Sequence, residues 1–417
     1  MSIGYACLTI GVKDANFKSC ILKNANEEKL LELISYNLKS LENIIDYNIK
    51  NNIKLFRITS DIITFGSNSV NKLNWWDIFN NDFERIGKKI QSSKMRVSMH
   101  PGQYTVINSP KEDVVKRSID DLNYHTKVLD CLGVGKENKM ILHIGGVYDN
   151  KEEAINRFIT NYEYLDKSVK DRLVIENDDK LYNILDVLDI GTKLNIPVVF
   201  DNLHNDINSS VEQRSTREWI NECKKTWKKE DGKQKIHYSE QDPLKKIGSH
   251  SSTISIDNFM KFYEELNRED IDIMLEVKDK NLSAVKCINC TSKNGNIKAL
   301  EEEWSRYKYK ILENSPNNYL EIRQLLKDKN SYPSVEFYNL IEESLKDQES
   351  IGNSINAANH IWGYFKDVAS EKEKKSFLKI IDDYREGNGS NNKVKSALWK
   401  LANKYNQEYL LNSYYFE

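Results

Sequence analysis

Short apolar runs alternate with longer amphipathic stretches along most of the chain. The runs are rich in Ile, Val, Leu and Met, which is typical of strands that are buried on both faces. Between them, stretches such as 27–49, 75–90 and 114–132 carry apolar residues at helical spacing. We expect strands at 3–10, 53–59, 94–100, 139–144, 172–176, 196–201, 233–238 and 271–276.

Strands that alternate with helices in this way predict an α/β fold, a TIM (β/α)8 barrel over residues 1–295. A doubly wound parallel sheet is the alternative, because it shows the same alternation. Such a sheet gathers its site at one switch point and has no need of polar residues at the ends of many strands. In this chain His, Asp or Glu closes most of the runs, which favours the barrel.

The pattern changes at residue 296, and only helical spacing follows. Segments such as 299–312 and 373–386 have aromatic-rich apolar faces. We therefore predict a separate all-α domain over residues 296–417. Its Lys, Tyr and Trp residues have two interpretations: they contact DNA by charge and stacking, or they form the aromatic core of a small helical bundle.

The residues that close the runs are of the metal-binding type. The carboxyl ends of barrel strands meet at one face, where imidazoles and carboxylates can together hold two or three divalent metals. A carboxylate that ends a core strand is costly unless it is paired or metal-bound. Any one of these residues alone is also explained as a loop cap or as a hydrogen-bonded residue at the end of the barrel. Together they predict a metal site. They are His100, His143, Glu176, Asp201, His204, His237, Glu276 and, in the next loop, His250.

Composition narrows the class of protein. A hydrophobic content of 39% and a charged content of 30% fit a soluble globular protein. No run approaches the about 18 apolar residues that span a bilayer, so we expect no membrane association. Six scattered cysteines suit a reducing compartment, and we expect a cytoplasmic location. The net charge of −2 gives no global sign of nucleic-acid binding but is compatible with a local basic groove.

Several segments, in this order, resemble the UV damage endonuclease (UvdE/UvsE) family. They are GYACLTI (4–10), RITSD (57–61), MHPGQYTVINSP (99–110), LHIGGVYDNKEEAINRF (142–158), LVIENDD (173–179), FDNLHN (200–205), KIHYSEQ (235–241), GSHS (248–251) and DIMLEVKDK (272–280). The resemblance implies a TIM barrel that nicks damaged double-stranded DNA immediately 5′ to UV lesions and other distortions. Residues 300–417 resemble a YbgA-type domain of unknown function.

The resemblance also implies a centre of three divalent metal ions, with Mn2+ expected and Zn2+ or Co2+ compatible with the same ligands. The first ion would be held by His100, His143 and Glu176, the second by Glu176, Asp201, His250 and Glu276, and the third by His204, Lys235 and His237.

Lys235 needs its own explanation, because an ammonium group has no lone pair for a metal. Side chains two apart on a strand share a face, so Lys235 and His237 should both point into the barrel. The family is known for a modified lysine, which implies that Lys235 is carboxylated or deprotonated. The alternative is a surface lysine or one that contacts phosphate. With this ligand set, Glu176, Lys235 and His237 are the expected catalytic residues.

Recognition of the lesion is assigned to other residues. By resemblance, Gln103 and Tyr104 form the wedge that fills the gap left by displaced nucleotides. Tyr5 is either a second aromatic contact or a packed barrel residue. The family often has an Asn shortly after this Tyr, and its absence here leaves the contacts of the first loop open. Arg57 either contacts phosphate or pairs with Asp61, and we favour the ion pair.

The expected activity is therefore that of a metal-dependent endodeoxyribonuclease that leaves a 3′-hydroxyl and a 5′-phosphate. We expect a monomer without an organic cofactor. One alternative is a sugar isomerase or epimerase on a related barrel, whose sites usually need fewer metals and fewer histidines. Another is a non-catalytic protein that binds damaged DNA and recruits partners through residues 297–417.

Overall fold

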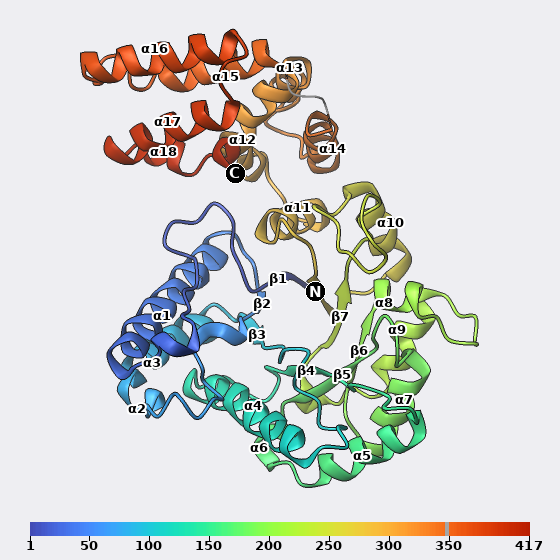
Figure 1. The fold of residues 1–417 in the computed structure, drawn as a ribbon. Coiled ribbons are helices and arrows are strands. Elements are labelled where there is room, and N and C mark those ends of the chain that lie inside the picture. The colour runs from blue at the N-terminus through green and yellow to red at the C-terminus, as the bar shows by residue number, and fades with distance from the viewer. Residues whose placement is uncertain (347–349) are drawn as a thin grey trace. The chain divides into compact units, whose positions relative to one another are not determined.

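The computed structural model describes residues 1–346 and 350–417, and Figure 1 shows its fold. The chain divides into two compact units. The first consists of Met1–Ile254 with Phe262–Val285, and the second of Ser255–Lys261 with Lys286–Glu417. The predicted domain boundary at 295/296 lies in the connection between two helices, α11 and α12, that end at Thr291 and begin at Ile297.

The first unit is built around parallel strands in the order β3-β2-β1-β8-β7-β6-β5-β4. Sequential strands are neighbours, β1 pairs with β8, and a parallel bridge between Met99 and Met140 joins the two edges. The predicted α/β TIM barrel is thus confirmed (Figure 1). The strands are β1 Ser2–Ala6, β2 Leu55–Arg57, β3 Arg96–Ser98, β4 Met140–His143, β5 Leu173–Glu176, β6 Val198–Asp201, β7 Gln234–Tyr238 and β8 Ile271–Leu275.

Helices surround these strands (Figure 1), and their ends follow local sequence rules. The first long helix begins after Asn26, whose side chain accepts from the backbone N–H of Lys29. The helix after β5 begins with a capping box between Asn183 and Asp186. These helices are α1 Glu27–Lys50, α2 Trp75–Ile78, α3 Asn80–Ser92, α4 Glu112–Cys131, α5 Lys151–Glu163, α6 Lys167–Lys170, α7 Ile184–Leu194, α8 Asn202–Ile207 and α9 Thr216–Lys224. Two further helices, α10 Ile256–Leu266 and α11 Asn281–Thr291, are each divided between the two units.

The first strand is shorter than the predicted 3–10, because the backbone turns at Cys7, which has a φ of 69°. The N–H of Leu8 then bonds to the carbonyl of Ala6 at 2.9 Å. Further along, the N–H of Ile10 is held by Asn281 Oδ1 at 2.7 Å. The end of the apolar run is therefore a loop anchored to the start of α11, and the N–H groups of Leu8 and Ile10 are satisfied without a neighbouring strand.

Buried ion pairs lie at the amino ends of the strands. Arg96 pairs with Asp272 at 3.1 Å, and Lys139 pairs with Asp231 at 2.5 Å. The Arg96 guanidinium also donates to three backbone carbonyls. Charges at this face of the barrel therefore have partners from the chain itself, as buried charges require.

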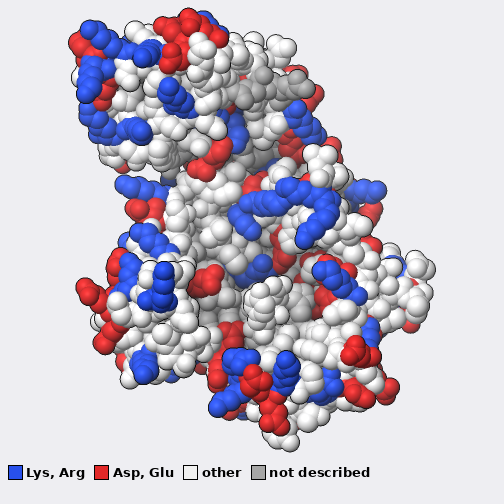
Figure 2. All heavy atoms as spheres, viewed as in Figure 1, with Lys and Arg blue, Asp and Glu red and all other residues white. Residues whose placement is uncertain are grey.

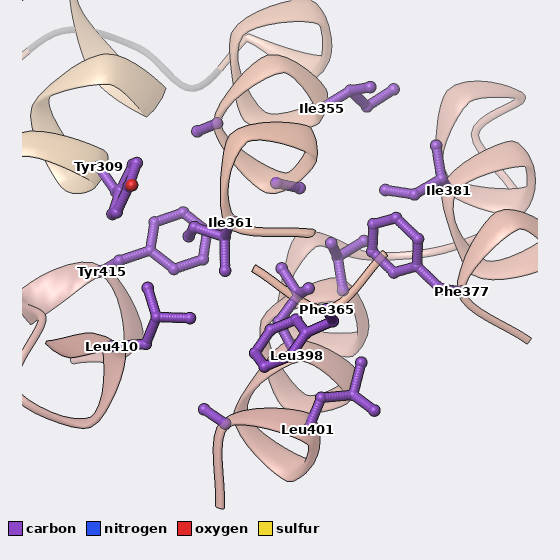
Figure 3. Close-up of a cluster of buried hydrophobic side chains, with 14 of the residues drawn as sticks. Tyr309, Ile355, Ile361, Phe365, Phe377, Ile381, Leu398, Leu401, Leu410 and Tyr415 are labelled. Carbon is purple, nitrogen blue, oxygen red and sulfur yellow. The ribbon is translucent and has the colours of Figure 1, made fainter. Parts of the chain in front are cut away.

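The second unit is helical among the described residues. Phe365 and Leu398 lie at the centre of its core, and Ile361, Phe377 and Tyr415 pack around them (Figure 3). Trp362 stacks on Phe377 with ring centroids 4.3 Å apart. Its helices are α12 Ile297–Asn314, α13 Pro316–Leu325, α14 Ser334–Ser344, α15 Ile351–Trp362, α16 Glu371–Arg385, α17 Asn391–Lys404 and α18 Glu408–Leu411.

The contact between α3 and the end of α4 predicts a stability effect. A Cβ added at Gly87 would lie 2.0 Å from the carbonyl oxygen of Leu132, which is backbone and cannot rotate away. We expect Gly87→Ala to lower the free energy of unfolding by about 1–3 kcal/mol, although alanine favours a helix over glycine by up to about 1 kcal/mol. Urea denaturation measures this change. Gly102→Ala, where the added atom meets nothing within 4 Å, is the control and should be nearly neutral.

Candidate metal centre

The predicted metal-type residues lie at the carboxyl ends of the barrel strands. His143, Glu176 and Asp201 are the last residues of β4, β5 and β6. Glu276 directly follows β8, and His237 is the fourth residue of β7. Because these ends share one face, residues far apart in sequence come together there.

Glu176 is the centre of this cluster. Its Oε1 lies 2.7 Å from His237 Nδ1 and 3.9 Å from His204 Nδ1. Its Oε2 lies 3.3 Å from His100 Nε2 and 3.8 Å from His143 Nε2. One buried carboxylate is therefore ringed by four imidazoles.

A second carboxylate extends the cluster. Glu276 Oε1 lies 3.4 Å from His237 Nδ1, and Glu276 Oε2 lies 3.8 Å from His250 Nε2. Asp201 and His237 also have ligand atoms that lie, with one of Glu176, within 4.8 Å of one another. The structure thus groups His237 with Glu176 and Asp201, as well as His100 and His143 with Glu176.

The orientation of two imidazoles fits a metal centre. His100 Nδ1 lies 3.0 Å from the carbonyl of Pro101, and His204 Nδ1 lies 2.9 Å from the carbonyl of Asn177. A carbonyl only accepts, so each Nδ1 carries hydrogen, and the Nε2 lone pair of the neutral ring is left for a cation. For His100, that lone pair faces a Glu176 oxygen 3.3 Å away. Two facing lone pairs need a proton or a cation between them.

Buried polar atoms without a hydrogen-bond partner support the same conclusion. Among the described residues they include Asp201 Oδ2, His237 Nε2, His143 Nδ1 and Lys235 Nζ. Unsatisfied buried groups each cost stability and call for an explanation such as an unseen ion. An oxygen and nitrogen donor set of this kind is what Mn2+, Zn2+ and Co2+ accept.

The electrostatics show how tightly the groups are coupled. Burial opposes ionisation of Glu176, but His237, His143 and His100 outweigh it and hold the pKa well below its usual range. Burial raises the pKa of Asp201 to about 6. For His204, burial is outweighed by the charges of Asp201 and Glu176, which raise the pKa to about 9. Without a metal, the positive charge next to Glu176 and Asp201 therefore comes mainly from protonated imidazole.

Lys235 lies inside the barrel, with none of its surface exposed. Burial, followed by the positive charge of Arg96, lowers the pKa of its amine well below the usual value. The interpretation as a surface or phosphate-contacting lysine therefore does not fit. An amine that is easily neutral is the form that can bind a metal or be carboxylated.

Two residues that hold predicted ligands in place by hydrogen bonds, Ser60 and Asn177, were not predicted from the sequence. Ser60 Oγ donates to the carbonyl of His100 at 2.7 Å and is itself 2.9 Å from the Nε2 of buried His125. Asn177 links β5 to β6, because its side chain bonds to both the N–H and the C=O of Asp201. The only sequence signal for Asn177 is its position directly after Glu176.

Arg57 has a different partner from the one predicted. Its guanidinium pairs with Glu276 and not with Asp61. The reason is direction: Arg57 ends β2 and points into the barrel, whereas Asp61 is an exposed residue of the following turn. Arg57 thus forms an ion pair, as predicted, but its partner Glu276 is one of the predicted metal ligands.

Tyr5 is buried with no exposed surface. Its hydroxyl lies 2.7 Å from Thr9 Oγ1 and donates to Asn48 Oδ1 at 2.8 Å. A side chain enclosed in this way does not reach DNA, so the structure favours the packed-residue alternative over the proposed contact with a damaged base pair.

Gln103 and Tyr104 are exposed on the connection between β3 and α4, and 83% of Tyr104 is accessible. They line a cleft of about 790 Å3 whose wall also includes His143 and His204. The cleft therefore joins the exposed tip of this loop to two of the imidazoles that surround Glu176.

Known proteins are similar to this chain in sequence and in fold. Residues 1–308 match the model of the family described as UV-endonuclease UvdE. The chain belongs to the UV-endonuclease UvdE family. The predicted resemblance is thereby confirmed, and residues 308–417 match the model described as a protein of unknown function (DUF1722), in agreement with the second resemblance.

Relatives within the UvdE family cover the chain to different extents. A UV DNA damage endonuclease of Clostridium perfringens (strain 13 / Type A) is 44% identical over 408 residues, which is 97% of this chain and 96% of that protein. One from Bacillus cereus (strain G9842) is 32% identical over 280 residues, or 67% and 88%. The solved "Crystal Structure of SacUVDE" has a TM-score of 0.66 and 40% identity, covering 70% of this chain and 97% of that one.

Neither the net charge nor the hydropathy of the described helices indicates a class of partner by itself. The net charge of −2 results from nearly equal numbers of basic and acidic residues, 61 and 63, and side chains of both signs lie on the face drawn in Figure 2. Any electrostatic attraction for DNA on this face therefore has to be local. Within the described ranges, no helix has the length and apolar character needed to cross a membrane.

The buried, unpartnered amine of Lys235 predicts an unusual stability effect. In metal-free protein kept in EDTA, we expect Lys235→Met to raise the free energy of unfolding by about 1–3 kcal/mol, because the cost of an unsatisfied buried donor is removed. Thermal or urea unfolding measures this. Lys233→Met, at an exposed neighbouring position, should leave stability nearly unchanged. A clear loss of stability in Lys235→Met would show that the amine has a partner in the metal-free protein.

Proposed function

We propose that this protein is a metal-dependent DNA repair endonuclease that nicks duplex DNA immediately 5′ to UV photolesions and other distortions. Membership of the UvdE family supports an endonuclease of UV-damaged DNA. The observation that carries metal dependence is the ring of four imidazoles around buried Glu176, with unsatisfied ligand atoms on Asp201 and His237.

The ligand set is proposed as in the sequence analysis, with three divalent ions and Mn2+ as the expected metal. Glu176 would belong to two ions, since it is close to both His100 and His143 on one oxygen and His237 on the other. When bound, the metals would polarise the scissile phosphate, lower the pKa of an attacking water and stabilise the leaving 3′ oxygen. The proposed products are a 3′-hydroxyl and a 5′-phosphate.

The protein's own residues set the charge of the site. Arg57 neutralises Glu276 from the side of β2 and, since burial is outweighed by that carboxylate, keeps a raised pKa and a fixed positive charge. Lys235 is proposed to act as a ligand after its neutral amine adds carbon dioxide and releases a proton, which would replace an unpartnered buried amine with an anion that the metals can pair. Intact-protein mass spectrometry and a high-resolution map test this modification directly.

Recognition is assigned to the loop that follows β3. Tyr104 is proposed to stack in the gap left by displaced nucleotides, and Gln103 to bond to base edges. Opening a duplex costs a few kcal/mol and costs less where a lesion already weakens stacking. A side chain that fills the gap therefore gains most at damaged sites, which is a source of selectivity.

The metal role of Glu176 is tested by Glu176→Gln, which keeps the shape of the side chain and removes its charge. With Mn2+ and a duplex that carries one pyrimidine dimer, we expect nicking to fall on the order of a hundredfold or more, because two metals lose a ligand. Metal content, measured by mass spectrometry of the metals, should fall with it. EDTA should abolish nicking by the unaltered protein.

Glu152→Gln, at an exposed position in the first turn of α5, is the matched control and should nick normally. Full activity of Glu176→Gln would contradict the proposal. Turnover of sugars without cleavage of DNA would favour an isomerase or epimerase. Lesion binding with no nicking by the unaltered protein under any divalent metal would favour a non-catalytic damage-binding protein.

The wedge is tested by Tyr104→Ala. Stacking on an aromatic side chain is worth about 1–3 kcal/mol per base, so we expect the preference for damaged over undamaged duplex to fall roughly tenfold while the cut position is kept. Competition nicking assays with both duplexes measure this ratio. Tyr164→Ala removes another highly exposed tyrosine, 77% accessible, and should leave the ratio unchanged. An unchanged ratio in Tyr104→Ala as well would rule out the wedge.

A further inference from the structure

Several cations of the second unit rest on aromatic rings, and Lys308 and Arg323 are two of them. Lys308 of α12 places its Nζ 4.6 Å from the ring centre of Tyr309 and 4.7 Å from that of Tyr409. Arg323 of α13 lies 5.7 Å from the ring centre of Tyr319. These contacts stabilise a cation moderately, but they do not neutralise its charge.

Within residues 1–346 and 350–417, neither cation pairs with a carboxylate. Other basic residues of the unit do: Lys395 pairs with Glu313 at 2.6 Å, and Lys404 with Glu373 at 2.7 Å. Burial, and then the positive charge of Arg323, lowers the pKa of Lys308. Two like charges are therefore held near each other in partly dry surroundings, and an anion between them would relieve both the repulsion and the lost hydration.

Open aromatic surface lies beside these charges. Tyr364 is 37% exposed and stacks on Tyr409 with an interplanar angle of 12°. Its hydroxyl accepts from that of Tyr309 at 3.0 Å, which fixes the ring. A ring held in this way loses little entropy when a flat ligand stacks on it.

We propose that this cluster, made of Lys308, Arg323 and Tyr364, binds an unpaired DNA strand, with phosphates on the two cations and a base on the exposed ring. Unpaired positive charge next to fixed aromatic surface is the combination that single-stranded nucleic acid uses. An acidic peptide would satisfy the cations but leave the ring without a role. The choice of DNA rests on the proposed function; the site itself rests on the cluster.

The experiment uses the full chain with a fluorescent oligothymidine in EDTA, and follows anisotropy over a range of salt concentrations. We expect Lys308→Met combined with Arg323→Gln to weaken binding at least about fivefold. The slope of log K against log salt should fall by about 1.4, since each single-strand phosphate contact contributes about 0.7. Tyr364→Ala should weaken binding about fivefold or more with an unchanged slope, because a stacked base is lost but no ion pair.

A matched control removes the same charge elsewhere in the unit. Lys375→Met combined with Lys379→Gln changes two exposed lysines of α16 and should leave both affinity and slope nearly unaltered. Arg323→Gln alone changes an exposed side chain, so its smaller expected loss is measurable even if the double variant is unstable.

Three results would overturn the proposal: variants that bind as the control does, tighter binding to an RNA oligomer of the same length, or equal binding to polyglutamate. Because EDTA removes metals, this binding does not depend on nicking. Glu176→Gln should keep it, and the double variant should still nick a damaged duplex with an unchanged kcat. Failure of the proposed function and failure of this site are therefore seen in different measurements.

Discussion

The arrangement of side chains at the carboxyl ends of the barrel strands depends on one buried charge. Glu176 is 1% exposed, and a carboxylate in such surroundings is tolerated only if positive charge compensates it. The fold meets this constraint by placing imidazoles from several strands around Glu176, among them His143 of β4 and His237 of β7. Each imidazole alone is a poor compensation, because protonating several of them side by side sets like charges against each other. Divalent metals, when bound as proposed, would remove that conflict.

Buried charges are compensated differently at the two ends of the barrel. At the amino ends, Arg96 pairs with Asp272 and Lys139 with Asp231, so the chain supplies both partners of each pair. At the carboxyl ends, ligand atoms of Asp201 and His237 have no partner among the described residues. The carboxyl ends also have pairs within the chain, such as Arg57 with Glu276, but they leave these ligand atoms unsatisfied. This difference supports the proposal that ions from outside the chain bind there.

The sequence predicted most of this because periodicity and strand ends carry the information. Apolar runs placed all the strands, the residues that close the runs predicted a metal site, and the family resemblance implied that Glu176 is shared between two ions. What it did not predict depends on direction and on long-range contact. Arg57 and Asp61 are close in sequence, yet the turn after β2 sends only Arg57 towards Glu276. The early end of β1 depends on a left-handed residue, Cys7, which no apolar pattern reveals.

The loop after β3 carries both a predicted metal ligand, His100, and the proposed wedge residue, Tyr104. The loop after β3 begins with His100, whose carbonyl is held by Ser60, which in turn contacts buried His125. Four residues later Tyr104 projects into solvent. The base of the loop is thus fixed to the barrel while its tip is free to enter a duplex, and the span between them is too short for the two to move independently. If the tip is the wedge, opening the duplex there would bring the strand to a fixed distance from the ligands around Glu176. Selectivity for distorted DNA and the position of the cut would then follow from the same piece of backbone.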